Sequence, residues 1–259
     1  MNPGNRPTPM TRRRFFAPPA AFTRDTVRLD VDEARYLREV LRLKVGAQVY
    51  VFNGQGKEFE CTVEEARRDS SLLKIVSEIE PARPESPLQL TLAVALLKGE
   101  KFDLVVQKAT ELGVTAITPL TTRLADIRLR DQSDAKKRVA RWQRIALEAA
   151  KQSGRSVVPE VGEPVAFDEF VANAPPSPAN LMFSERDGDS LLPAMNKLSK
   201  PLGPVTALVG SEGGWTDEEI NGARDSGWKI ITLGGRTLRA ETAAIVVTAL
   251  LQHLLGDLA

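Results

Sequence analysis

The chain has 259 residues and a formal net charge of +1, with 42% hydrophobic and 27% charged residues. This balance is typical of a globular protein with one large or two ordinary domains, and no apolar run is long enough to span a membrane. A lone cysteine, Cys61, and a lone histidine, His253, argue against an internal disulfide or a zinc site. No secretory segment follows the first arginines, so we expect a cytoplasmic protein without a metal.

Residues 11–80 predict a small β-rich domain of barrel type. A short helix is expected over residues 32–43, and Phe15 and Phe16 are expected on a first strand that enters the core. Three further β-prone runs cover residues 48–53, 58–64 and 72–80. The proline-rich segment 81–87 then marks a domain boundary.

Residues 88–259 alternate strand and helix patterns, which is typical of an α/β domain with a parallel sheet. The expected strands are residues 88–97, 115–119, 180–183, 205–209 and 230–233. The expected helices cover residues 98–112, 133–152, 191–198 and 240–255, with another that begins at Thr216.

Two glycine-bearing turns follow the last two of these strands, at residues 210–215 and 234–239. Ligands of open parallel sheets bind beyond the carboxyl ends of the strands, so we expect one pocket between these turns. Neither turn matches the glycine patterns of dinucleotide folds or P-loops. Thr216 and Glu219 fit a capping box, and the acidic residues of that helix start disfavour a phosphate. A ligand such as S-adenosylmethionine, which carries no phosphate and has a cationic sulfonium, suits an acidic site of this kind.

Basic residues gather in two stretches of a nearly neutral chain. Between Arg123 and Arg155 there are ten basic and four acidic residues, and Arg12, Arg13 and Arg14 form a second group. Local basic faces of this kind favour a defined contact with nucleic acid. For the helix around residues 136–144, a solvated helix face is an equally good interpretation.

Several segments of the chain resemble the bacterial 16S rRNA methyltransferase E family (RsmE), whose members are SPOUT-type enzymes. They methylate N3 of a uridine in 16S rRNA and use S-adenosylmethionine. The resemblance rests on RRFF at residues 13–16, VLRLKVG at 40–46, QKATELGV at 107–114, EAAKQSGR at 148–155, GSEGGW at 210–215 and LGGRTLRAETA at 233–243. Ser211 departs from it, because the family usually has proline there.

The resemblance implies a PUA-like N-terminal barrel and a C-terminal α/β domain with a deep trefoil knot. It also implies a homodimer that acts on 16S rRNA or the small ribosomal subunit. The residues that correspond to the family's cofactor pocket are Phe183, Ser184, Glu185, Val209, Gly210, Gly213, Leu233, Gly234, Arg236 and Leu238.

The chemistry of the reaction suggests which side chains take part. Uracil N3 is a poor nucleophile until it loses its proton, and a guanidinium beside a flanking carbonyl oxygen favours the resulting anion. Arg239 is our first candidate for this role and Arg123 the second. Glu241 could orient an arginine or accept the proton, although a carboxylate early in a helix is also stabilised by the helix dipole. For contact with RNA we expect Arg12, Arg13, Arg14, Arg42 and Arg155.

Two other functions remain compatible with the sequence. The chain could methylate another RNA position, such as a ribose 2′-hydroxyl, with the same cofactor. It could instead be a non-catalytic RNA-binding module of the ribosome whose glycine turns are only turns. Calorimetry with S-adenosylmethionine separates this last alternative from the enzymes.

Overall fold

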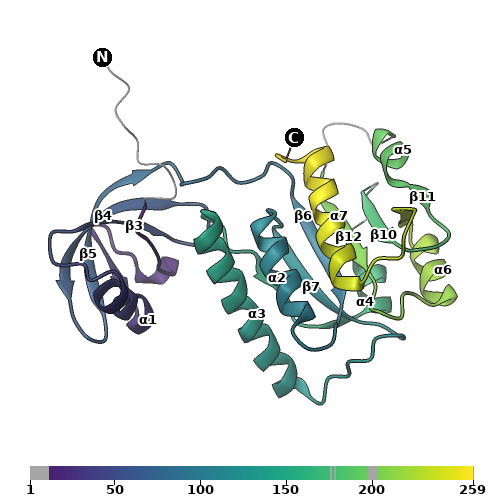
Figure 1. The fold of residues 1–259 in the computed structure, drawn as a ribbon, viewed down its shortest axis with the longest axis horizontal. Coiled ribbons are helices and arrows are strands. Elements are labelled where there is room, and N and C mark those ends of the chain that lie inside the picture. The colour runs from purple at the N-terminus through teal and green to yellow at the C-terminus, as the bar shows by residue number, and fades with distance from the viewer. Residues whose placement is uncertain (1–11, 176, 178, 198–202, 259) are drawn as a thin grey trace. The chain divides into compact units, whose positions relative to one another are not determined.

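The computed structural model describes residues 12–175, 177, 179–197 and 203–258, which form two compact units (Figure 1). Unit 1 contains Met1–Glu85 and Ala150–Val158, and unit 2 contains Ser86–Ala149 and Pro159–Ala259. The domains expected from the sequence, 11–80 and 88–259, differ from this division in the short segment 150–158. Among the described helices, none combines the length and apolarity that crossing a membrane requires.

Unit 1 is built on a five-stranded sheet with the order β1-β3-β4-β5-β2. Its strands are β1 (Arg14–Phe16), β2 (Thr26–Leu29), β3 (Gln48–Phe52), β4 (Glu58–Ala66) and β5 (Ser71–Ile79). As predicted, Phe15 enters the core of this unit, where it is fully buried with Leu29, Val51 and Leu73. Phe16 is half-buried and packs on Phe52.

The helix of unit 1 is shorter and less regular than its sequence pattern predicts. A 3-10 turn, η2 (Pro19–Ala21), precedes it in the chain. Helix α1 (Val31–Arg35) begins at an Asp30 side chain that caps the backbone of Glu33, and it continues as a π-helical turn, η3 (Tyr36–Val40). The helix ends before Arg42, whose φ of 52° lies in the left-handed region that residues other than glycine rarely adopt.

Two arginines expected to contact RNA lie inside unit 1. The Arg14 guanidinium donates to both carboxylate oxygens of Glu58 at 3.2 and 3.1 Å, and to the carbonyl oxygens of Lys151 and Arg155. Arg155 is equally buried and donates to Glu85 at 2.9 Å. Because protein acceptors already hold these guanidinium groups away from water, Arg14 and Arg155 stabilise the fold, and we leave them out of the RNA-binding set.

Unit 2 is built on a parallel sheet with the order β11-β13-β10-β12-β6-β7-β8, in which β9 also pairs with β7. Its strands are β6 (Leu90–Ala95), β7 (Ala116–Thr121), β8 (Glu160–Val161), β9 (Val165–Ala166), β10 (Asn180–Phe183), β11 (Asp189–Ser190), β12 (Val205–Val209) and β13 (Lys229–Thr232). Its helices are α2 (Lys101–Glu111), α3 (Gln132–Ser153), α4 (Phe167–Asn173), α5 (Leu191–Asn196), α6 (Asp217–Asp225) and α7 (Ala240–Leu255), and the residues of α3 after Ala149 belong to unit 1. The helix expected over residues 191–198 thus ends at Asn196, and Leu198 lies outside the described residues.

Strand β13 enters the sheet between β10 and β11, although it follows both of them in the chain. The chain that joins β10 to β11 must therefore pass across β13, as a knotted topology requires. Gly188 lies at this crossing, where an added Cβ would approach the backbone of Ile231 and Thr232 to 2.6 Å. Only glycine allows two backbones to approach this closely.

The strand register brings the C-terminal ends of β10, β12 and β13 to the same level in the sheet. Phe183, the last residue of β10, pairs with Val209 at the end of β12 and with Ile231 near the end of β13. The loops that follow these strands therefore leave the same edge of the sheet side by side. Helix α7 packs against β12, β6 and α2 below them.

Candidate active site

The three loops that leave the sheet at the ends of β10, β12 and β13 enclose a cavity of about 460 Å³. All ten residues that the family resemblance assigns to the cofactor pocket line it. The other lining residues are Ser211, Glu212, Gly214, Trp215, Thr232, Gly235, Thr237, Arg239, Ala240, Ala243 and Val247. One pocket between the two glycine turns is therefore present, as the sequence predicts.

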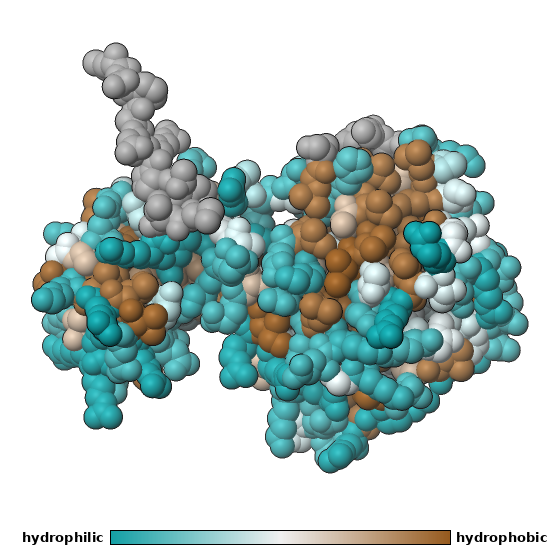
Figure 2. Space-filling model, in the orientation of Figure 1, coloured by the Kyte–Doolittle hydropathy of each residue, from teal (hydrophilic) through white to brown (hydrophobic). Residues whose placement is uncertain are grey.

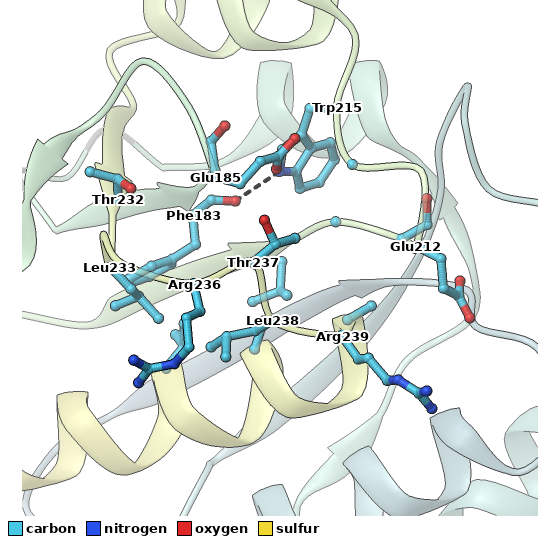
Figure 3. Close-up of a pocket in the computed structure, with 18 of the residues that line it drawn as sticks. Phe183, Glu185, Glu212, Trp215, Thr232, Leu233, Arg236, Thr237, Leu238 and Arg239 are labelled. Carbon is cyan, nitrogen blue, oxygen red and sulfur yellow. Dashed lines mark hydrogen bonds between the residues drawn. The ribbon is translucent and has the colours of Figure 1, made fainter.

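Trp215 ties the loop after β12 to the end of β10. Its indole Nε1 donates a 2.8 Å hydrogen bond to the carbonyl oxygen of Phe183 (Figure 3). The indole lies against Gly210, where an added Cβ would come within 3.1 Å of the ring, and Phe167 supports it from behind at 5.1 Å between ring centroids. A side chain at position 210 would therefore push against the indole, which favours glycine there.

Two further glycines of this loop meet neighbouring chain segments. A Cβ on Gly213 would approach the Cβ and carbonyl oxygen of Leu124 to 2.9 Å. Gly214 has a φ of 70°, and a Cβ there would approach the Glu185 carboxylate to 2.9 Å. The loop after β12 is thus in contact with residues that follow β7 and β10.

The cavity has the chemistry of a site for an uncharged ring and a cation. Leu233, Leu238 and Val247 supply apolar surface, while the glycine turns expose backbone groups. The hydroxyl of Ser211 is buried and has no hydrogen-bond partner among the described residues, so it is available to a ligand. The guanidinium groups of Arg236 and Arg239 point in different directions in Figure 3 and do not form a cradle for phosphate.

The three residues expected to act in catalysis do not all meet at this cavity. Arg239 lines it and is the last residue before α7. Glu241 belongs to the first turn of α7 but does not line the cavity, and its carboxylate lies 3.9 Å from the ammonium of Lys101 on α2. One oxygen of this carboxylate is buried without a hydrogen-bond partner among the described residues.

Lys101 also binds Glu212 in the loop after β12, at 2.7 Å. Burial raises the pKa of the Glu212 carboxyl, but the hydrogen bond and charge of Lys101 together with backbone hydrogen bonds outweigh this effect, and the pKa lies below its ordinary value. Glu212 is therefore a carboxylate at neutral pH, and Lys101 links the loop after β12 to the start of α7.

Arg123 lies outside the cavity, on the loop that follows β7. Its backbone N–H donates to Glu219 at 2.9 Å, while its exposed guanidinium lies 3.6 Å from the Glu218 carboxylate. Glu219 is 1% exposed and completes the predicted capping box with Thr216. The sequence indicates the capping box, but the contact with Arg123 spans 96 positions and gives no local signal.

Comparisons with known proteins agree with this architecture. An RNA methyltransferase domain family matches residues 84–252, and an RNA methyltransferase PUA domain family matches residues 29–76. The ribosomal RNA small subunit methyltransferase E of Synechocystis is 36% identical over 93% of this chain and 78% of its own. The Rickettsia conorii protein of the same name is 32% identical over 86% of each chain.

A solved structure extends the similarity to three dimensions. The ribosomal RNA small subunit methyltransferase E of Neisseria gonorrhoeae, bound to S-adenosyl methionine, matches with a TM-score of 0.85 and 33% identity. The match covers 96% of this chain and 100% of the other. The loops at the strand ends enclose a cavity, both domain families match, and the relatives are similar in sequence over nearly the whole chain. This protein therefore belongs to the ribosomal RNA small subunit methyltransferase E family.

Proposed function

We propose that this enzyme transfers a methyl group from S-adenosylmethionine to N3 of a uridine in 16S rRNA. The observation that carries the proposal is the cavity at the ends of β10, β12 and β13, lined by every residue that the family resemblance assigns to the donor. The Neisseria gonorrhoeae relative, which shares the fold, is bound to S-adenosyl methionine. The N3 position follows from membership of the RsmE family.

The residues of the cavity fit this donor. Leu233, Leu238 and the backbone around Gly234 would hold the adenine, and the unpartnered hydroxyl of Ser211 is free to bind a polar group of the ligand. The carboxylate of Glu185 lines the same cavity and favours a positive charge, whereas that of Glu212 is already paired with Lys101. When bound, S-adenosylmethionine supplies an electrophilic methyl group on a sulfonium.

The acceptor base needs a different environment. Arg239 lines the cavity and would direct its guanidinium to a carbonyl oxygen beside N3, so that the base loses its proton more readily. Glu241 faces Lys101 and not the cavity, so we assign it to holding the start of α7 in place. Arg123 stands on the neighbouring loop, where its exposed guanidinium suits contact with the RNA chain.

Arg13 and Arg42 are the residues of unit 1 that best fit a contact with RNA. Both are exposed, and Arg42 projects from a backbone in the left-handed region. Strained backbone of this kind persists where the surrounding structure holds it, often at binding sites. Arg12 is half-buried and donates to Glu58 at 3.3 Å and to the carbonyl oxygen of Glu80 at 3.2 Å, so it fits a contact with RNA less well than the other two arginines. Because the proposed substrate is rRNA, we expect the enzyme in the cytoplasm.

The outer face of α7 supports a homodimer. Ile245, Val246, Ala249 and Leu250 lie on one side of this helix and are only partly buried. Figure 2 shows a hydrophobic area over α7. A contiguous apolar face beside the donor cavity suits burial against a second copy of the chain.

The direct test is methylation of 16S rRNA by the purified enzyme. Small ribosomal subunits from cells without this activity are incubated with S-adenosylmethionine labelled in its methyl group. Mass mapping of nuclease fragments then identifies the modified nucleotide and the methylated atom. We expect a single 3-methyluridine in 16S rRNA, whereas a methyl group on a ribose or another base would refute the assignment of N3.

A further inference from the structure

Helix α3 separates buried from charged residues along its length. Its inner face carries Ala135, Trp142, Ala146 and Ala149, which are at most 8% exposed. The opposite face spans about 140° at 100° per residue and carries exposed cations on consecutive turns. These residues, the α3 basic stripe, are Lys136, Lys137, Arg141 and Arg144.

The charge of the stripe is largely uncompensated. Lys136, Lys137 and Arg144 make no ion pair with any described residue, whereas the neighbouring Arg138 is paired with Asp134. Arg141 is bound to Asp103 of α2, and no acidic residue interrupts the stripe between positions 136 and 144. The exposed Glu148, four residues after Arg144, lies at the end of this face, so the stripe is basic from Lys136 to Arg144 and ends there.

The helix that carries the stripe is held firmly in unit 2. The Trp142 ring packs on Phe102 of α2 with 4.3 Å between ring centroids, and its Nε1 donates to Asp103 at 3.1 Å. Gln143 donates to the carbonyl oxygen of Pro159 and accepts from the backbone N–H of Val161. The helix that carries the stripe is therefore already fixed, so binding a ligand costs little backbone conformational entropy.

A short chain segment leads from the donor cavity to this stripe. Residues 122–131 run from the end of β7 to the start of α3 (Figure 1). Leu124 of this segment touches Gly213 in the cavity wall, and Arg128 donates to the carbonyl oxygens of Thr122 and Arg123. Glu219 holds the backbone of Arg123. The segment is thus fixed against the donor loop and carries further cations toward α3.

The chemistry of this path favours a nucleic-acid backbone over a protein. Protein interfaces have an apolar centre, whereas Ala140 is the lone apolar residue exposed within the stripe. Lysine and arginine on successive turns of one face offer a row of donors to successive phosphates. A row that starts beside the cavity can hold the strand that flanks the nucleotide inside it.

We propose that Arg123, Arg128 and the α3 basic stripe form a phosphate-binding track, which holds the rRNA backbone that leads away from the target nucleotide. This inference rests on the proposed function and extends it by naming the surface that binds the substrate. The track lies within unit 2, and its cations position the RNA without reading its sequence.

The test uses the full-length enzyme with Lys136→Gln, Lys137→Gln and Arg144→Gln combined. A control variant removes the same charge elsewhere on unit 2, with Lys197→Gln, Arg224→Gln and Lys229→Gln. Binding of unmethylated 16S rRNA transcript and of small subunits is measured from about 50 to 200 mM salt. Calorimetry with S-adenosylmethionine confirms that the donor cavity is intact in both variants, because neither set of residues lines it.

We expect the stripe variant to bind the transcript about tenfold or more weakly at low salt. Its plot of log affinity against log salt concentration should be less steep by about 2 to 3, while the control stays near the wild type. Equal binding and equal slopes in the two variants would overturn the track. Weaker binding to small subunits alone, with an unchanged slope for the transcript, would also overturn it and assign the stripe to an acidic ribosomal protein. Both readouts are independent of methylation, so the track can fail while the proposed function stands.

Discussion

The indole Nε1 of Trp215 lies 2.8 Å from the carbonyl oxygen of Phe183 and joins two of the three loops that form the donor cavity. Both groups are buried, so neither can exchange this hydrogen bond for one with water. The bond therefore fixes the distance between the loop after β12 and the end of β10. A ligand that contacts both loops binds to a cavity that is already formed.

Replacing Trp215 with phenylalanine removes this bond and leaves the Phe183 carbonyl without its partner. A buried acceptor stranded in this way costs about 1–3 kcal/mol, so we expect the Kd for S-adenosylmethionine to rise about tenfold. Titration calorimetry measures the change. Trp228→Phe is the matched control, because its buried Nε1 has no partner among the described residues and should leave affinity unchanged. Equal effects of the two substitutions would contradict the role of the bond.

Arg239→Ala should lower the turnover number about 100-fold or more at saturating donor, because a preorganised cation beside the developing charge is lost. The Kd for S-adenosylmethionine should change less than about threefold if Arg239 faces the base. Arg236→Ala provides the contrast, since Arg236 is assigned to the donor and should mainly raise its Kd. Steady-state kinetics with calorimetry distinguishes them, and a large loss of donor affinity in the Arg239 variant would make it a donor-binding residue.

Gly188→Ala should destabilise unit 2, because the new methyl group would lie 2.6 Å from the backbone of Ile231 and Thr232 at the crossing of the chain. Overpacking of this kind costs about 1–3 kcal/mol, and more where the backbone cannot move. Thermal unfolding monitored by tryptophan fluorescence should show a lower Tm. Gly222→Ala, in the middle of α6 with open space around it, should raise stability by about 0.5–1 kcal/mol.

Glu58→Gln should strongly destabilise unit 1. Glu58 is fully buried and accepts from Arg14, Arg12 and the backbone N–H of Ala82, so its loss leaves a buried guanidinium uncompensated. Breaking a buried pair costs about 3–5 kcal/mol. Hydrogen exchange in β3 and β4 reports the loss. The exposed pair of Glu78 with Lys57 is the control, and Glu78→Gln should cost at most about 1 kcal/mol.

Val246→Glu should dissociate the proposed homodimer, because a carboxylate within an apolar interface loses its hydration without gaining a partner. Light scattering after gel filtration should show the wild type at twice the chain mass and the variant at the mass of one chain. Val76→Glu is the control, since Val76 is also an exposed valine, at 57%, but lies on β5 of unit 1. A wild-type enzyme that elutes as a single chain at all concentrations would remove the dimer.

The sequence alone predicts much of the donor site. Apolar runs that end in glycine turns indicate parallel strands, and the structure has β12 and β13 at these positions. Because parallel strands end at the same edge of a sheet, the turns that follow them were expected to form one pocket. The capping box at Thr216 and Glu219 is also a local pattern that survives in the fold.

Only the tertiary structure decided what the charged residues do. The sequence places Arg14 and Arg155 in basic stretches, but their partners Glu58 and Glu85 lie 44 and 70 positions away. Burial decides whether such a guanidinium stabilises the fold or remains available to a phosphate, and burial depends on contacts distant in the chain. The insertion of β13 between β10 and β11 is likewise invisible to local patterns, since hydrophobic periodicity fixes which residues form strands but not the order in which those strands pair.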